Sequence, residues 1–297
     1  MRKWYIALFA LACVALVFVT VQLTRTGEGP IFRGHHLSYW LVLAQAHPEN
    51  EMAGEAIRNA GTNALPFLLK WIRYEPPPWK VKVLNATPRS LTGPVSFVIT
   101  SHRHFRASQS ANAFRVLGTN AISAVPELTA LARNTNAPLT SVYAIQALPW
   151  IGPDGLASLV SLIQDRRYPL RAWAVAAISI TPTNAPGSTI IGPALIQCLN
   201  DSTDPRIPVT ALMWLDKSRF EPAVSIPAIA ASLINPVSSE DLRCGALYAL
   251  ATYGAQAATA LPTITNAQAY TSTRVRTAAT NAIRDITAAI ATNTRPP

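Results

Sequence analysis

The sequence predicts an all-α protein: a right-handed α-solenoid of about seven stacked helix pairs, preceded by one N-terminal transmembrane helix. Three observations predict this fold. Hydrophobic residues make up 49% of the 297 residues, which is enough for a continuous core. A short helical pattern recurs along most of the chain, and such self-similarity is typical of helical-repeat architectures. Near its start the chain also carries a long apolar run without charged residues.

The apolar run is Trp4–Leu23, WYIALFALACVALVFVTVQL. At about 1.5 Å per residue, twenty helical residues span roughly 30 Å of hydrocarbon. The apolar part of a cleaved signal peptide is usually only about 7 to 15 residues long. We therefore expect residues 1–25 to be a transmembrane anchor, with a cleaved signal sequence as the alternative, and residues 26–36 to be a linker. Arg2 and Lys3 favour a cytoplasmic N-terminus, although Arg25 and Arg33 lie on the far side.

The first element of each repeat is an Ala-x-x-x-Leu or Ala-x-x-x-Ile step. Side chains four residues apart share one face of a helix, so a small and a large residue at this spacing suit close helix packing. The step occurs as Ala113/Leu117, Ala144/Leu148, Ala174/Ile178, Ala211/Leu215, Ala246/Leu250 and Ala279/Ile283.

A second apolar element follows each step and begins near a proline, as in VPELTALA from Val125 and IPAIAASL from Ile226. Proline has no N–H donor and suits the first turn of a helix. The tetrapeptide Gly-Thr-Asn-Ala stands at 61–64 and again at 118–121. We expect the glycine to end the first helix and Thr or Asn to cap the second.

These signals predict an α-solenoid over residues 37–292 and a tail at 293–297. A terminal helix, Leu37–Ala46, should begin with Ser38 as its N-cap and carry Trp40 as a core residue. The Pro/Gly-rich stretch 181–189 lengthens one repeat without ending the period. The predicted repeats are 51–73, 108–134, 139–165, 170–200, 205–235, 240–268 and 272–291.

These helix pairs resemble the HEAT-repeat family, in particular bacterial proteins with one N-terminal anchor, an LSYWL-like segment and then HEAT repeats. The resemblance covers residues 37–290. It implies that Arg171, Arg243 and Arg276, each three residues before the repeat's alanine, bond between neighbouring repeats. It also implies a single-pass protein of the bacterial inner membrane whose repeats face the periplasm or the exterior.

No catalytic, cofactor-binding or metal site can be assembled from the sequence. Nucleophile motifs, phosphate-binding glycine loops and CxxC pairs are absent, and acids such as Asp165, Asp201 and Asp241 are expected at helix ends and turns. His102 and His104 are expected at the surface, and the repeated His-Glu dipeptides of iron-binding HEAT-like oxygenases are absent. Cys198 and Cys244 should be buried thiols that form no disulfide. We accordingly expect the chain not to be an enzyme and to need no cofactor.

One segment, the basic insert at residues 74–107, breaks the period. No acidic residue occurs between Pro76 and Pro126, while aromatic residues such as Trp79, Phe97 and Phe105 lie among the basic ones. Such a segment suits anionic partners. We favour a solvated helix pair whose aromatics pack on the first repeat, with an anion-contacting surface as the alternative. The candidate anion-contacting residues are Lys80, Lys82, Arg89, Arg103 and Arg106.

The sequence thus predicts a membrane-tethered scaffold that binds a protein through its helical-repeat surface, because stacked helix pairs form extended surfaces. A formal net charge of +10 keeps a second function open, the binding of an anionic polymer or of lipid headgroups through the insert. A third is an enzyme with unrecognised chemistry. The expected partners are an unidentified protein, the membrane through Trp4–Leu23 and an anionic ligand; we do not expect nucleic acid.

Overall fold

The computed structural model describes residues 29–88 and 102–293. The predicted anchor Trp4–Leu23 lies outside these residues. Within the two described ranges, no helix is both long enough and apolar enough to cross a membrane. The chain divides into unit 1, which ends at Phe67, and unit 2, which begins at Leu68.

Unit 1 begins with a β-hairpin where the sequence predicted only a linker. Strand β1 (Ile31–Phe32) pairs antiparallel with β2 (His35–His36). The two turn residues, Arg33 and Gly34, have φ angles of 46° and 79°. A two-residue hairpin turn of type I′ needs positive φ at both positions, which glycine adopts freely and arginine does not. Every other secondary-structure element of the described residues is a helix.

Helix α2 (Leu37–Ala46) leaves the hairpin directly, with His36 at the N-cap position, so the prediction that Ser38 caps it was wrong. Trp40 is a core residue, as predicted, with only 3% of its surface exposed. Its indole N–H points at the carbonyl oxygens of Phe32 and His35, at 3.1 and 3.3 Å. Helix α3 (Glu51–Ala60) is capped by the Asn50 side chain, which accepts from the backbone N–H of Ala53.

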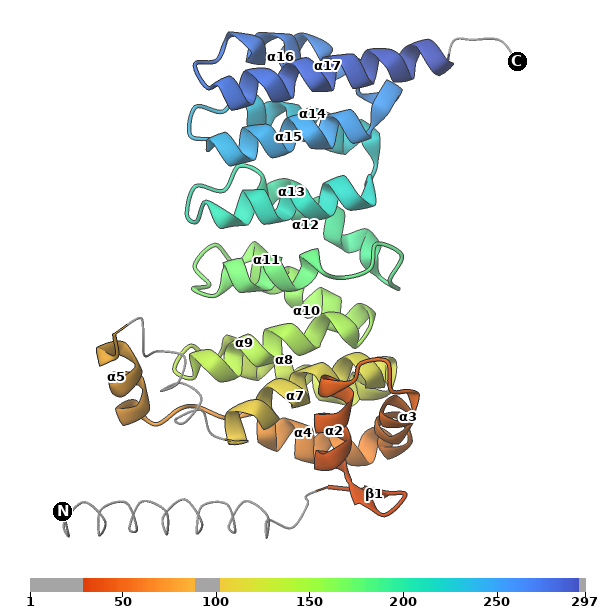
Figure 1. The fold of residues 1–297 in the computed structure, drawn as a ribbon, viewed down its shortest axis with the longest axis vertical. Coiled ribbons are helices and arrows are strands. Elements are labelled where there is room, and N and C mark those ends of the chain that lie inside the picture. The colour runs from red at the N-terminus through yellow and green to blue at the C-terminus, as the bar shows by residue number, and fades with distance from the viewer. Residues whose placement is uncertain (1–28, 89–101, 294–297) are drawn as a thin grey trace, which may run out of the picture. The chain divides into compact units, whose positions relative to one another are not determined.

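In unit 2, five consecutive helix pairs and a last single helix form one stack along the described chain (Figure 1). A separate helix, α5 (Pro78–Ala86), precedes them, and α4 (Leu65–Ile72) crosses from unit 1 into unit 2. The pairs are α7 (His102–Leu117) with α8 (Val125–Arg133), α9 (Pro138–Ala147) with α10 (Pro153–Gln164), α11 (Arg171–Ser179) with α12 (Ile191–Cys198), α13 (Arg206–Ser218) with α14 (Pro222–Ile234), and α15 (Glu240–Thr252) with α16 (Leu261–Asn266).

The stack ends in α17 (Thr273–Asn293), a continuous 21-residue helix. The seventh predicted repeat, 272–291, is therefore a single helix and not a pair. Helix α7 begins at His102, earlier than the predicted repeat start at 108, so the end of the basic insert belongs to the first helix pair of the stack.

Proline placement explains several helix starts. Pro126 and Pro262 lie in the first turns of α8 and α16, as predicted. Gly61 and Gly118 follow the last residues of α3 and α7 at φ angles of 51° and 54°, so the prediction that glycine ends the first helix is confirmed. The prediction that Thr or Asn caps α8 was wrong, because residues 118–124 form a 3₁₀ turn and Ala124 stands at the N-cap of α8 without a side-chain cap. Helix α14 begins at Pro222 and carries Pro227 inside it, so the predicted start near Ile226 was also wrong.

Neighbouring pairs are joined by side chains that bond backbone carbonyls at the ends of the preceding helices. Arg243 on α15 donates to the carbonyl oxygens of Leu233 and Asn235 at the end of α14. Arg276 on α17 donates to those of Tyr270 and Thr271. Helix ends leave carbonyl groups without intrahelical partners, and these donors satisfy them. Arg243 thus bonds between repeats, as the family resemblance implied, whereas Arg276 bonds the turn that leads into its own helix.

Candidate functional site

The basic insert is fastened at both of its ends to helix α9. At its start, the Glu75 carboxylate accepts a hydrogen bond from the backbone N–H of Thr140 in the first turn of α9, at 2.6 Å. At its end, Nδ1 of His104 lies 3.2 Å from the Tyr143 hydroxyl on α9. A carboxylate at a helix N-terminus is stabilised by the unpaired N–H groups and the helix dipole. Glu75 therefore acts as a fixed attachment point.

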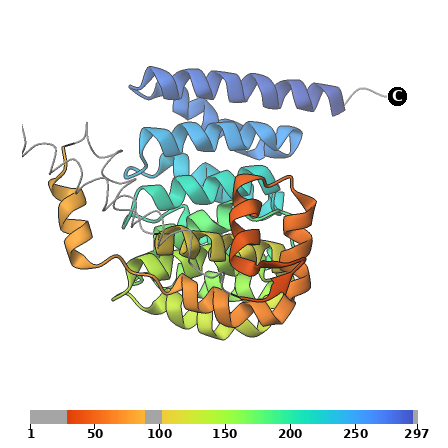
Figure 2. The same ribbon diagram turned by 60° about the horizontal axis from the view of Figure 1, so that its bottom comes forward.

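Between these two attachments, α5 stands apart from the helix pairs, as the separate orange helix of Figure 2 shows. Trp79 is 57% exposed, and Val81, Lys82 and Val83 are exposed with it. The ammonium group of Lys80 lies 5.6 Å from the centre of the Trp79 ring. Helix α5 therefore presents an aromatic ring, two valines and basic groups on one small exposed element.

The start of α7 adds a second exposed group, formed by Arg103 and Phe105. Arg106 is half-buried, and its guanidinium stacks 5.1 Å from the centre of the Trp71 ring. The structure therefore places Lys80 and Lys82 on α5 and Arg103 and Arg106 on α7. Arg89, the fifth candidate, and Phe97 lie outside the described residues.

The acid at the start of the insert, Glu75, and the next acid along the chain, Glu127, both have described partners. Glu75 caps α9, and Glu127 forms an ion pair with Arg73 at 2.7 Å. Lys82 and Arg103 form no ion pair with any described residue. Lys82 and Arg103 are therefore exposed basic groups without a described acidic partner, and such groups attract anions.

His104 is half-buried and contacts aromatic rings, so the prediction of a surface histidine was wrong. Its ring lies 6.1 Å from the rings of Tyr74, Phe105 and Tyr143. Burial, and then the nearby charge of Lys80, hold the pKa of His104 below its ordinary value of 6.5. Burial, with the negative charge of Glu75 and the neighbouring Tyr74, raises the pKa of Tyr143 to about 12.

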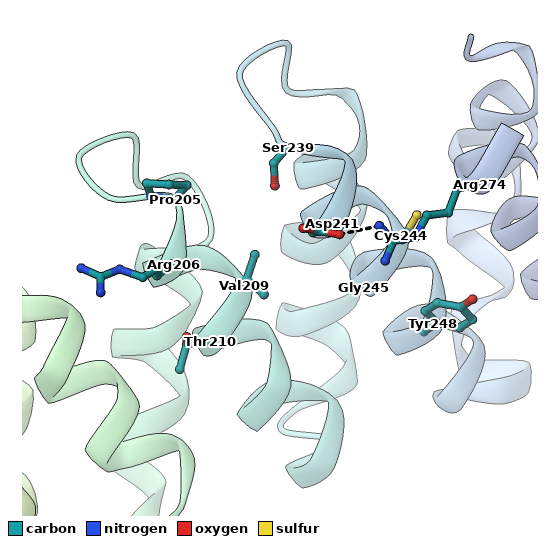
Figure 3. Close-up of a pocket in the computed structure, with 10 residues that line it drawn as sticks. All are labelled: Pro205, Arg206, Val209, Thr210, Ser239, Asp241, Cys244, Gly245, Tyr248 and Arg274. Atoms are coloured by element: carbon teal, nitrogen blue, oxygen red, sulfur yellow. Dashed lines mark hydrogen bonds and ion pairs between the residues drawn. The ribbon is translucent and has the colours of Figure 1, made fainter. Parts of the chain in front are cut away.

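A second candidate site is a groove of about 620 Å³ along the N-terminal halves of α13 and α15 (Figure 3). Its sides carry charged pairs: Arg274 bonds Asp241 at 2.5 Å, and Arg206 bonds Asp204 at 2.6 Å. Tyr248 stands exposed at one edge. The residues that line it are Pro205, Arg206, Val209, Thr210, Ser239, Asp241, Cys244, Gly245, Tyr248 and Arg274.

The repeat register explains why the groove lies at this place. The residue before the repeat's alanine is Trp173 on α11, Thr210 on α13 and Gly245 on α15. The side chain therefore shrinks from an indole to a hydrogen atom along three successive first helices, which leaves a hollow beside Gly245. Sequence analysis missed the groove, although aligning these three positions would have indicated it.

Cys244 lines the groove but is almost fully buried, and Cys198 is also buried; both are free thiols, as predicted. Burial raises the pKa of Cys198 to about 11 and also raises that of Cys244. A protonated, buried thiol is a poor nucleophile and a poor metal ligand. Within residues 29–88 and 102–293, no three His, Cys, Asp or Glu side chains are grouped as a metal site would require.

Fold and site together define the class of protein: an α-solenoid of stacked helix pairs with a basic insert fastened to one of its helices. No family model matches the chain, and neither does any curated protein. One solved structure to which the chain is similar is human deoxyhypusine hydroxylase in complex with glycerol, at 14% identity and a TM-score of 0.36. That alignment covers 85% of this chain and 95% of the other.

This comparison corrects one prediction. We expected the chain not to be an enzyme, and that exclusion was wrong, because the solved structure to which it is similar is itself an enzyme, a hydroxylase. At this low identity and TM-score, the similarity assigns no activity, substrate or cofactor to the chain.

Proposed function

We propose that the chain is a membrane-associated protein of the HEAT-repeat type whose basic insert binds anionic lipid headgroups. One observation carries the proposal: α5 exposes Trp79, Val81 and Val83 together with Lys82, inside the stretch 76–126, which has no acidic residue. Arg171 and Arg243, which bond the preceding helix pair, support the HEAT-repeat part of the proposal.

The chemistry of α5 fits the boundary between lipid headgroups and hydrocarbon. Tryptophan is enriched at that boundary because its ring is apolar and its N–H needs a polar partner. Basic side chains near an anionic surface add to the affinity, and their contribution fades within about 10 Å at about 0.1 M salt. Arg103 and Phe105 on α7 repeat the same combination of charge and apolar surface.

The predicted anchor Trp4–Leu23 fits this proposal, because an anchored chain holds its insert close to a bilayer. We propose, as an extension, that the repeats lie outside the cytoplasm of a bacterial cell. Only the segment 24–73 separates the anchor from the insert in sequence.

The test uses the full chain with lipid nanodiscs of phosphatidylcholine alone or of phosphatidylcholine with phosphatidylglycerol. Hydrogen exchange at residues 79–86 should slow only when phosphatidylglycerol is present, and added salt should reverse the change. The double variant Lys82→Glu/Arg103→Glu should lose this protection. Arg167→Glu/Lys217→Glu is a matched control, because it makes the same change in net charge at exposed sites elsewhere.

Equal protection on both lipids, or equal loss in both double variants, would overturn the proposal. Single-stranded DNA in place of nanodiscs is a third arm. Protection by DNA and not by phosphatidylglycerol would reassign the insert to an anionic polymer.

A second candidate function is recognition of a protein along the stack. The groove between α13 and α15 supports it, since it combines an apolar floor with charged sides and an exposed tyrosine. Crosslinking from a photoreactive residue at position 248 in intact membranes tests it. We expect the photoreactive residue to capture one defined protein. The variant Gly245→Trp, whose side chain fills the groove, should lose this capture. The absence of any specific adduct would count against protein recognition.

A further inference from the structure

We infer that His104 makes the lipid-binding insert sensitive to pH, so that a proton gained at its ring strengthens binding to an anionic surface. The inference rests on the proposed function and concerns the regulation of that same site.

His104 lies where the insert meets the stack. Its Nδ1 is 3.2 Å from the Tyr143 hydroxyl on α9, and its ring contacts Tyr74 from the segment before α5. Lys80 on α5 is close enough to act on it electrostatically. On its own helix, Arg103 and Phe105 precede and follow it. Three elements therefore meet at one titratable ring.

The charged group that acts on the pKa of His104 is a cation, Lys80. Lys80 brings a positive charge from α5, and the Tyr143 phenol, whose pKa is raised to about 12, is neutral near neutral pH. Glu75 acts on the pKa of Tyr143, but it is not among the groups that shift the pKa of His104, which are burial and Lys80. No described carboxylate forms an ion pair with His104. An imidazolium at this position therefore has a nearby cation and no described anion to pair with.

An anionic lipid surface would supply that missing negative charge. In the free chain, burial and Lys80 hold the pKa of His104 below 6.5, so the ring is neutral at pH 7. Headgroup phosphates next to Lys80 and Arg103 favour the imidazolium and raise this pKa in the bound state. Because the bound chain then holds the proton more tightly than the free chain, binding must strengthen as the pH falls, by at most about tenfold per pH unit for one proton.

The experiment uses the full chain in neutral detergent micelles that contain increasing fractions of phosphatidylglycerol. The measured quantity is the mole fraction of phosphatidylglycerol at which protection of residues 79–86 from hydrogen exchange is half-maximal. It should fall about 3- to 10-fold when the pH is lowered from about 7.5 to about 5.5. At each pH, exchange is compared with that in neutral micelles, which removes the intrinsic pH dependence of exchange. His104→Gln keeps a polar partner for Tyr143 but gains no proton, so its half-maximal fraction should not change with pH.

His47→Gln is the matched control, because His47 is an exposed histidine in unit 1 that pairs with Glu49, and this variant should keep the wild-type pH response. NMR titration of the wild-type histidines gives a second measurement. The pKa of His104 should rise when phosphatidylglycerol is added, whether or not the glutamine variant folds well.

The possible failures are distinguishable. Wild-type chain that shows no protection by phosphatidylglycerol at either pH overturns the proposed function itself. Protection that is the same at both pH values, with an unchanged pKa of His104, overturns only the role of His104 and leaves lipid binding intact.

Discussion

Arg171 and Asp201 form an ion pair that is almost completely buried, with side chains 7% and 3% exposed. Arg171 begins α11, and Asp201 follows α12 of the same pair. The Arg171 Nε also donates to the carbonyl oxygen of Ile163 on α10, at 2.5 Å, and its NH2 group lies 3.7 Å from the Cys198 sulfur. One guanidinium therefore joins two successive helix pairs.

Removing this arginine should destabilise the stack strongly. Arg171→Leu leaves the buried Asp201 carboxylate without its partner, and loss of one member of a buried pair costs about 3 kcal/mol or more in the free energy of unfolding. Urea unfolding followed by circular dichroism measures the loss. Arg243→Leu is the matched control, because Arg243 donates to carbonyl groups and stacks on the Tyr270 ring but has no described carboxylate partner, and it should cost about 1 to 2 kcal/mol.

If the two variants lose equal stability, the buried charge is not the cause. Adding Asp201→Asn to Arg171→Leu should recover part of the loss, since it removes the unpaired charge.

Asp201 should also make the chain sensitive to acid. Burial by itself would raise the pKa of Asp201, but hydrogen bonds from Thr203 and Arg171 outweigh burial and hold the pKa below its ordinary value of 3.8. A lowered folded-state pKa means that the carboxylate's contribution is fully present above pH 3.8 and is lost as the pH falls through the lower folded value. The stability difference between wild type and Asp201→Asn should therefore shrink below pH 3.8, measured by urea unfolding across the acid range. A constant difference would contradict this assignment.

Gly155 permits a close approach between α10 and the turn before it. A Cβ atom at this position would lie 2.1 Å from the Leu148 carbonyl oxygen, which is backbone and cannot move aside cheaply. Gly155→Ala should therefore lower the melting temperature, with a cost of about 2 to 3 kcal/mol. Gly245→Ala is the control: its Cβ would meet only the end of the Leu212 side chain, at 3.0 Å, and alanine favours the helix. Equal effects of the two substitutions would contradict this explanation.

The segment Trp4–Leu23 should tether the chain, with the repeats outside the cytoplasm. An alkaline-phosphatase fusion at Pro297 should be active in bacteria, because that enzyme folds only after export, and a cytoplasmic reporter at the same position should be inactive. The reverse pattern would overturn the predicted orientation. Release of the chain from membranes by carbonate would favour the cleaved signal sequence.

The sequence predicted the helix pairs because the signals for them are local. The Ala-x-x-x-Leu step, the prolines of the second helices and the buried Trp40 each depend on residues within about two helical turns. The same register placed Arg171 and Arg243 between neighbouring pairs, but Arg276 bonds the turn before its own helix. The exact helix starts were predicted wrongly where more than one nearby residue could begin the helix. His36 and not Ser38 is the N-cap of α2, and Pro227 lies inside α14.

The sites, in contrast, depend on residues that are far apart in the chain. Glu75 meets Thr140 across 65 positions, and His104 meets Tyr143 across 39. The groove beside Gly245 needs α13, α15 and α17 side by side. Composition could show that the insert is basic and aromatic, but not that Glu75 is occupied at a helix N-terminus or that α5 leaves Trp79 exposed.

The sequence by itself determined the class of fold, the repeat period and the positive charge of the insert. These properties follow from residues close together in the chain and need no knowledge of tertiary contacts. Only the tertiary structure decided which charges are paired and which side chains stay exposed. Burial and ion pairing depend on contacts between separate repeats, and the stacking of helix pairs brings those repeats together.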